Sequence, residues 1–131
     1  SSGEWKNTEA LLSIDELIVY PGAELPVIDA IKLGAPGCIS ATANLNSSDI
    51  AKVINLCHDN EWNNAEELHK KVKSVRMLFQ DYAPIPAQKR LLAMKTGNDI
   101  WSIVRPPLLS MSKEKGQELA KELNDNYGYS F

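Results

Sequence analysis

One stretch of the sequence decides the fold of this chain: Gly34-Ala35-Pro36-Gly37-Cys38-Ile39-Ser40-Ala41-Thr42-Ala43-Asn44. It contains a short apolar run, residues 37–40, which is followed by small residues. A second apolar run, residues 17–20, ends at Pro21-Gly22. Apolar runs without alternation are typical of strands that are covered on both faces, as in parallel sheets. Residues 24–33 between the runs have helical spacing and precede Gly34, so the region predicts one strand–helix–strand unit.

After Asn44 the sequence predicts helices only. Their signals are, in chain order, an N-cap at Asn46 or Ser47, the capping pair Asn63 and Glu66, a start at Pro86 with an end at Gly97, and a start after Ser112. The dipeptide Pro106-Pro107 excludes helix from the segment before the last helix and favours an extended connector. The chain therefore divides into strand–helix units over residues 1–46 and a helical region over residues 47–131.

Two parallel strands are too few to form a stable sheet, because both outer edges would keep unpaired backbone groups. The strands therefore need neighbours that this chain does not contain. Either the sequence is the C-terminal part of a larger α/β chain, or another polypeptide completes the sheet. The opening Ser1-Ser2-Gly3 has no initiating Met and reads as the middle of a loop, which favours the first alternative.

Composition narrows the functional classes. The 131 residues include 14 Lys and Arg against 17 Asp and Glu, which gives a formal net charge of −3. No basic stripe offers a surface for a phosphate backbone, so nucleic acid is not an expected partner. No apolar run is long enough to span a membrane, and no signal peptide is recognisable, so we expect a soluble, cytoplasmic protein. Cys38 and Cys57 are expected to be free, buried thiols, and His58 and His69 lack the companions of a metal site.

Several motifs resemble, in the right order, those of a known enzyme family. They are Ser1-Ser2-Gly3, Tyr20-Pro21-Gly22-Ala23-Glu24, the stretch from Gly34 to Asn44, Pro84-Ile85-Pro86 and Arg105-Pro106-Pro107-Leu108. They resemble motifs of the dihydrodipicolinate synthase and N-acetylneuraminate lyase family, whose eighth strand reads Gly-x-x-Gly-x-Ile-Ser-x-Thr-x-Asn. The resemblance covers essentially the whole chain. It implies an α/β fold in which residues 1–46 are the last βα units of a (β/α)8 TIM barrel and residues 47–131 are the barrel-closing helix and the C-terminal helical region.

The resemblance also implies a chemistry. Members of this family form a Schiff base between a barrel lysine and pyruvate or another 2-keto acid, and the iminium then accepts the electrons of a neighbouring carbanion. The matching lysine would lie two residues before Ser1, so the 131 residues alone are expected to be inactive. No metal or organic cofactor is required, because the iminium is itself the electron sink. A homo-oligomer of the full-length chain, a dimer or a tetramer, is the expected assembly.

Four residues are candidates for the site, because active sites of such barrels lie at the C-terminal ends of the strands. The resemblance places Gly22 beside the substrate and the Ile39 backbone carbonyl next to the lysine, where it would orient the amine. Ser40 is a candidate contact for a substrate hydroxyl or carboxylate, or it simply packs at a strand end. Glu24 is a candidate acceptor for sugar hydroxyls or, alternatively, a favourable charge in the first turn of its helix. Gly22 is alternatively an ordinary turn glycine.

Three functions follow from these observations. The leading one is a Schiff-base aldolase or lyase that acts on pyruvate or on 2-keto-3-deoxy sugar acids. Dihydrodipicolinate synthesis proper, from pyruvate and aspartate semialdehyde, is an alternative, although Ala83 stands where the family usually has the Asn of Asn-Pro-Ile-Pro, and this difference argues against it. A non-enzymatic module that binds a partner through its helices is the third, and stable, monomeric, cooperative unfolding of the 131 residues alone would favour it.

Overall fold

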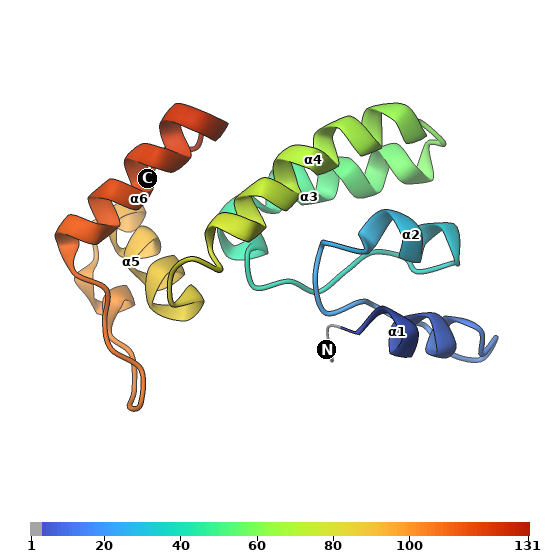
Figure 1. Ribbon diagram of the computed structural model, residues 1–131, viewed down its shortest axis with the longest axis horizontal. Helices are drawn as coiled ribbons and strands as arrows, with labels where there is room; N and C mark the ends of the chain where they lie inside the picture. Colours follow the sequence, from blue (N-terminus) through green and yellow to red (C-terminus); the bar gives the residue numbers. More distant parts are fainter. Residues whose placement is uncertain (1–3) are drawn as a thin grey trace. The chain divides into compact units, whose positions relative to one another are not determined.

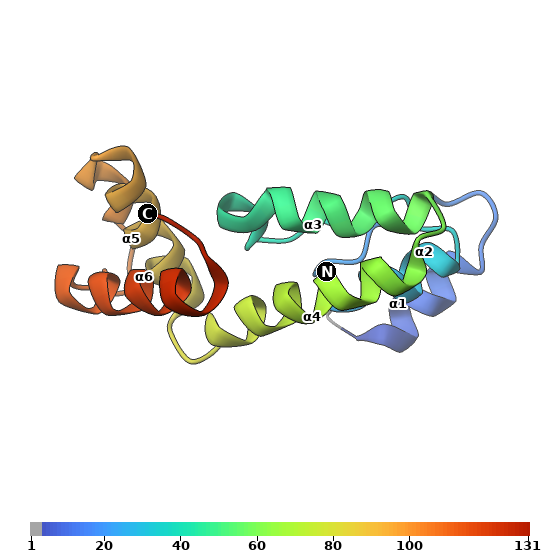
Figure 2. The same ribbon diagram turned by 90° about the horizontal axis from the view of Figure 1, so that it is seen from above.

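The structure is a computed structural model that describes residues 4–131, so the opening Ser1-Ser2-Gly3 lies outside the described part. The chain divides into two compact units, residues 1–74 and 75–131. The elements (Figures 1 and 2) are, in chain order, α1 (Trp5–Leu12), α2 (Val27–Lys32), α3 (Ala43–His58), α4 (Trp62–Leu78), α5 (Pro84–Thr96), the 3-10 helix η1 (Asp99–Ser102) and α6 (Lys113–Tyr127). Helix α4 runs from the first unit into the second.

The core of the first unit lies between α2, α3 and α4. Helices α3 and α4 run antiparallel to each other (Figures 1 and 2), and Asn60 at φ 62° lies in the turn that joins them. A salt bridge of 2.8 Å between Lys71 and Asp49 links the two helices. Their facing side chains and those of α2 form one apolar cluster, whose fully buried members are Val27, Ile28, Ile50, Val53, Cys57, Ala65 and Val72. This cluster fixes α4 as a rigid support for the loop that precedes α2.

The prediction of two strands is wrong for the described chain. Residues 17–20 and 37–40 are irregular, and residues 4–131 contain no strand. One backbone hydrogen bond of 3.0 Å joins the two segments, from the Ile39 N–H to the Pro21 carbonyl oxygen. A strand needs a ladder of such bonds, and a single bond between the two segments does not form one.

Three helix boundaries differ from those that the sequence predicts. Helix α2 begins at Val27 rather than near residue 24, because Pro26 restricts the residue before it and occupies the N-cap position. Helix α3 begins at Ala43, and the predicted N-cap Asn46 instead marks a kink inside it, with φ −123° and ψ 30°. Helix α4 begins one residue before Asn63, so Asn63 is not its N-cap. The ends at Gly34 (φ 97°) and Gly97 (φ 65°) are confirmed, since both glycines adopt the left-handed conformation that ends a helix.

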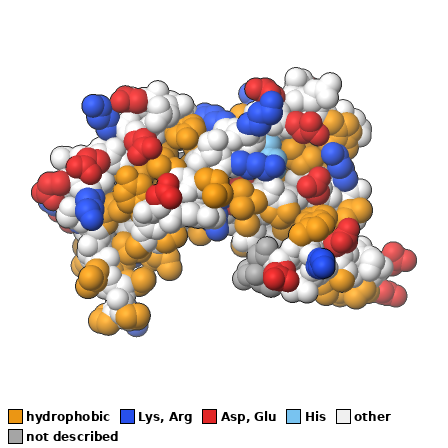
Figure 3. Space-filling model, viewed as in Figure 1, with side chains coloured by type: hydrophobic (Ala, Val, Ile, Leu, Met, Phe, Trp, Pro, Cys, Tyr) orange, Lys and Arg blue, Asp and Glu red, His pale blue; other side chains and the backbone are white. Residues whose placement is uncertain are grey.

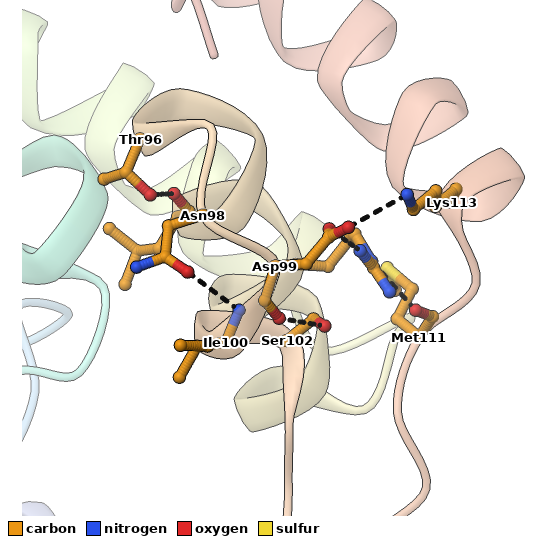
Figure 4. A network of polar contacts seen from close by, with 9 residues as sticks. Thr96, Asn98, Asp99, Ile100, Ser102, Met111 and Lys113 are labelled. Carbon is orange, nitrogen blue, oxygen red and sulfur yellow. Dashed lines mark hydrogen bonds and ion pairs between the residues drawn. The ribbon is translucent and has the colours of Figure 1, made fainter.

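The second unit is organised around Arg90 of α5, which is buried. Its Nε donates to the Met111 carbonyl oxygen at 2.9 Å, and its Nη1 contacts Asp99 Oδ1 at 3.3 Å. Lys113 donates to the other oxygen of Asp99 at 3.0 Å (Figure 4). The predicted start of α6 after Ser112 is confirmed, because the Ser112 side chain caps the helix by accepting from the Lys115 N–H. Arg90 and Asp99 thus fix the base of the segment between η1 and α6.

That segment carries exposed apolar side chains. Ile103 is 63% exposed and Leu109 is 85% exposed, and Figure 3 shows hydrophobic atoms gathered on this projecting loop. No helix forms there, as predicted, but Pro106 and Pro107 form a turn closed by the Leu108 N–H to Arg105 carbonyl bond of 3.0 Å, rather than an extended run.

Candidate functional site

The candidate site lies where the loop before α2 meets the turn before α3. Glu24, from the loop, is completely buried. Its carboxylate oxygens accept hydrogen bonds from two hydroxyls of that turn, Oε2 from Ser40 and Oε1 from Thr42. A buried carboxylate is costly unless its oxygens are hydrogen-bonded, so these two bonds allow Glu24 to lie in the interior. Glu24 therefore joins two segments that are 16 to 18 residues apart in the sequence.

The two hydroxyls have no further proton to donate. A serine or threonine hydroxyl carries one hydrogen and two acceptor lone pairs. Ser40 Oγ and Thr42 Oγ1 lie 3.0 Å apart, but both protons point to Glu24, so the carboxylate rather than a mutual hydrogen bond holds them together. Thr42 is fully buried and Ser40 is half-buried. Ser40 can therefore still accept a hydrogen bond from a group outside the cluster, and it cannot donate one while it is bound to Glu24.

The other predicted site residues lie next to this cluster. Ile39 directly precedes Ser40, and its N–H donates to Pro21, the residue before Gly22. The Ile39 side chain is 70% exposed, and Gly22 is also exposed. The structure thus brings Glu24 and Ser40 into direct contact and leaves Gly22 and Ile39 at the surface beside them.

Two residues of this cluster were not predicted to belong to it. Thr42 lies in the stretch from Gly34 to Asn44, but no sequence pattern there indicates that it binds Glu24. His69, on α4, is 3% exposed, and its Nε2 lies 2.8 Å from the Glu24 carbonyl oxygen. The separation of 45 residues between His69 and Glu24 hides this contact from any local pattern. Burial lowers the pKa of His69 below its usual range, and the charge of the nearby Lys73 lowers it further. The hydrogen bond to Glu24 raises this pKa but does not outweigh burial.

Neither cysteine is suited to act as a nucleophile. Both thiols are free; Cys57 is buried, whereas Cys38 is only half-buried. Burial and, to a smaller extent, the charge of Glu24 raise the pKa of Cys38 to about 11, and burial also raises the pKa of Cys57. Because the thiolate is the reactive form, the raised pKa values disfavour a nucleophilic role for either thiol at neutral pH.

Apolar side chains beside the site face solvent. Leu17 is 47% exposed, Ile18 is 79% exposed and Tyr20 is 48% exposed. Together with Ile39 they belong to the two segments that were predicted to be doubly covered strands.

Across residues 4–131 no group of three or more His, Cys, Asp or Glu side chains could hold a metal ion. No helix in this part of the chain has the length and apolar character that crossing a membrane requires.

Known proteins resemble this chain in sequence. The 4-hydroxy-tetrahydrodipicolinate synthase of Thermodesulfovibrio yellowstonii is 29% identical over 126 residues, which are 94% of this chain and 42% of the relative. The 4-hydroxy-tetrahydrodipicolinate synthase 2 of Clostridium acetobutylicum is 30% identical over 120 residues, which are 90% of this chain and 41% of the relative. The chain thus spans about two fifths of the length of these curated relatives.

Solved structures show the same extent of similarity. Dihydrodipicolinate synthase from Agrobacterium tumefaciens matches 97% of this chain with 42% of its own, at 26% identity and a TM-score of 0.73. N-acetylneuraminate lyase from Fusobacterium nucleatum, complexed with pyruvate, matches 96% of this chain with 42% of its own at a TM-score of 0.79, and at 20% identity it shows the fold alone. The model of the Dihydrodipicolinate synthetase family matches residues 2–126. This chain belongs to the Dihydrodipicolinate synthetase family.

Proposed function

We propose that this chain is the C-terminal part of a Schiff-base-forming, class I aldolase or lyase that acts on pyruvate or on 2-keto-3-deoxy sugar acids. Membership of the family supports the reaction type. The observation that carries the proposal is the link from Glu24 to Ser40 and Thr42. It joins the ends of the two apolar segments, as an active site at the C-terminal ends of adjacent barrel strands requires.

The proposed barrel has its first strands upstream of this chain. Residues 1–46 would supply the last βα units and residues 47–131 the barrel-closing helix and the C-terminal helical region. The bond between the Ile39 N–H and the Pro21 carbonyl would be one step of the ladder between the last two strands. The high exposure of Ile18 and Ile39, 79% and 70%, supports this proposal, since neighbouring strands and helices would cover these side chains.

The proposed mechanism assigns a role to each predicted site residue. The neutral amine of an upstream lysine adds to the ketone carbon of pyruvate, and loss of water gives the iminium. The Ile39 carbonyl oxygen would accept a hydrogen bond from the lysine amine and orient it. Gly22 would leave room for the substrate, because it has no side chain to obstruct it. Glu24 is completely buried, so it would act by holding Ser40 at the edge of the pocket rather than by meeting substrate hydroxyls itself.

The hydrogen bonds of Ser40 favour a hydroxylated substrate. The Ser40 hydroxyl donates its proton in a hydrogen bond to Glu24, so Ser40 offers only acceptor lone pairs to a substrate. An acceptor can bind a substrate hydroxyl, which donates, but it repels a carboxylate, which only accepts. This arrangement supports a sugar-acid substrate over a contact of Ser40 with a substrate carboxylate.

The synthesis of 4-hydroxy-tetrahydrodipicolinate is a second candidate, because the curated relatives at 29% and 30% identity carry that name. Ala83 bears on the choice. It caps α5 without any side-chain hydrogen bond, so the donors and acceptor of the family's usual Asn are missing at this position. Parallel assays decide between the candidates: condensation of pyruvate with aspartate semialdehyde, and pyruvate release from a panel of 2-keto-3-deoxy sugar acids.

The proposed reaction type is tested by trapping. The complete protein, meaning this chain together with the upstream barrel strands, is incubated with pyruvate and reduced with borohydride. We expect a covalent adduct of reduced pyruvate on a lysine upstream of Ser1, located by mass spectrometry of peptides. The matched control omits pyruvate. Absence of an adduct, or an adduct on a lysine of this chain alone, would overturn the proposal. The size of the complete protein in solution tests the proposed homo-oligomer.

A further inference from the structure

His69 connects the rigid core to the candidate site. It lies on α4, whose Ala65 and Val72 are fully buried in the apolar cluster of the first unit. Its Nε2 lies 2.8 Å from the carbonyl oxygen of Glu24. A carbonyl oxygen can only accept, so Nε2 must carry the proton in this contact and Nδ1 holds the lone pair of the neutral ring. The same carbonyl accepts the Val27 N–H at 3.2 Å, which uses both of its lone pairs.

We infer that His69 is a positioning residue for the proposed active site. It fixes the main chain of Glu24 against α4, and the Glu24 side chain in turn fixes Ser40 and Thr42. Ser40 directly follows Ile39, so this chain of contacts runs from the helix to the carbonyl oxygen that we assign to the lysine. The inference rests on the proposed function and adds to it a residue that touches neither substrate nor lysine.

Burial makes His69 suited to this role. At 3% exposure the ring is shielded from water, so water cannot replace its bond to Glu24, and a lost partner is costly. His58 offers a contrast within the same unit. Its Nε2 contacts the Pro36 carbonyl oxygen at 3.2 Å, but the ring is exposed and water can substitute for it. His58 therefore provides a matched control for the loss of a histidine–carbonyl bond.

The test compares His69→Met, His69→Gln and His58→Met in the complete protein. Methionine removes the donor, whereas the amide nitrogen of glutamine can reach the position of Nε2 and restore it. We expect His69→Met to speed amide hydrogen exchange in residues 22–25 and 39–42 and to lower kcat about tenfold, with KM for pyruvate within about threefold of the wild type. His69→Gln should restore both properties toward the wild type, and His58→Met should leave both unchanged.

The outcomes separate the two proposals. Unchanged exchange in His69→Met, faster exchange with normal kcat, or equal damage by Met and Gln would overturn the role of His69. A wild-type protein that forms no borohydride adduct would overturn the proposed reaction instead, and the exchange comparison would then still decide whether His69 holds the loop. Faster exchange that Gln reverses, together with the kcat loss, supports the inference.

Discussion

Removal of either hydroxyl that binds Glu24 should destabilise the protein, and the two removals should differ in size. Thr42→Val keeps the shape of the side chain but leaves Glu24 Oε1 without its donor in a completely buried site. An unsatisfied buried acceptor that carries charge costs about 1.5–3 kcal/mol. Ser40 is half-buried, so water can replace its hydroxyl in Ser40→Ala, and we expect a cost of about 0.5–1.5 kcal/mol.

Substitution of the carboxylate tests whether these costs come from Glu24. Glu24→Gln keeps the volume but replaces one acceptor oxygen by an amide nitrogen, which should cost about 1–2 kcal/mol. In the double variant with Thr42→Val, the hydrogen bond between Thr42 and Glu24 is already absent. The cost of the double variant should therefore fall short of the sum of the two single costs by about 1 kcal/mol.

Urea unfolding of the complete protein, followed by circular dichroism, measures these free energies if the slope with urea stays constant among variants. Ser48→Ala, at an exposed position of α3, is the control and should change the midpoint little. Equal costs for Ser40→Ala and Thr42→Val, or strict additivity of Glu24→Gln and Thr42→Val, would contradict the argument that one buried carboxylate holds both hydroxyls.

Three further predictions concern other residues. Gly116→Ala should lower the stability of the second unit by about 1–3 kcal/mol in thermal unfolding, because its Cβ would lie 2.4 Å from Cγ of Arg90, which is held by Met111; an unchanged or higher Tm would contradict this. The pKa of His69 is lowered in the folded protein, so as the pH falls the unfolded chain takes up a proton at this residue before the folded protein does. The free energy of unfolding should therefore fall as the pH drops below about 6.5. His69→Gln should weaken that fall, and an identical pH dependence in this variant would exclude His69 as its cause. Cys38, with a pKa of about 11, should react with iodoacetamide at a rate that rises about tenfold per pH unit from pH 8 to 10 while the protein stays folded, and a plateau near pH 8.5 would show an ordinary exposed thiol.

Local sequence signals predicted the helices best. Ser112 and Gly97 each act within one turn of the chain, through a capping hydroxyl and a left-handed conformation, so neighbouring residues suffice to identify them. Boundaries were wrong where two local preferences competed. Pro26 occupies the N-cap position of α2, so this helix begins at Val27. Helix α3 begins at Ala43, before the predicted N-cap Asn46, and is kinked at Asn46.

The absence of strands from residues 4–131 could not be predicted from the apolar runs, because a strand also needs neighbours to hydrogen-bond with. The apolar character of residues 17–20 and 37–40 favours strands, whereas the described residues supply a single backbone bond between the two segments. The motifs spread along the chain, from residues 1–3 to residues 105–108, indicate the family, and the family match over residues 2–126 confirms it.

The candidate site was only partly predictable. The family resemblance and the position at the ends of the two apolar segments predict Gly22, Glu24, Ile39 and Ser40 as site residues, and the structure brings Glu24 and Ser40 into contact. The bonds of Glu24 to Thr42 and of its carbonyl to His69 depend on how α4 packs against the loop. Such packing joins residues 18 and 45 positions apart, and no local spacing encodes it.

The shared carboxylate of Glu24 also limits how related sequences can diverge. One acidic group binds two hydroxyls, so loss of Glu24 leaves both hydroxyls without their acceptor, and loss of either hydroxyl leaves one carboxylate oxygen without its donor. Homologues that replace Glu24 by an apolar residue are expected to have lost the hydroxyls at positions 40 and 42 as well. In an alignment these three columns should therefore vary together, and a change of substrate at the proposed site would require coordinated substitutions rather than one.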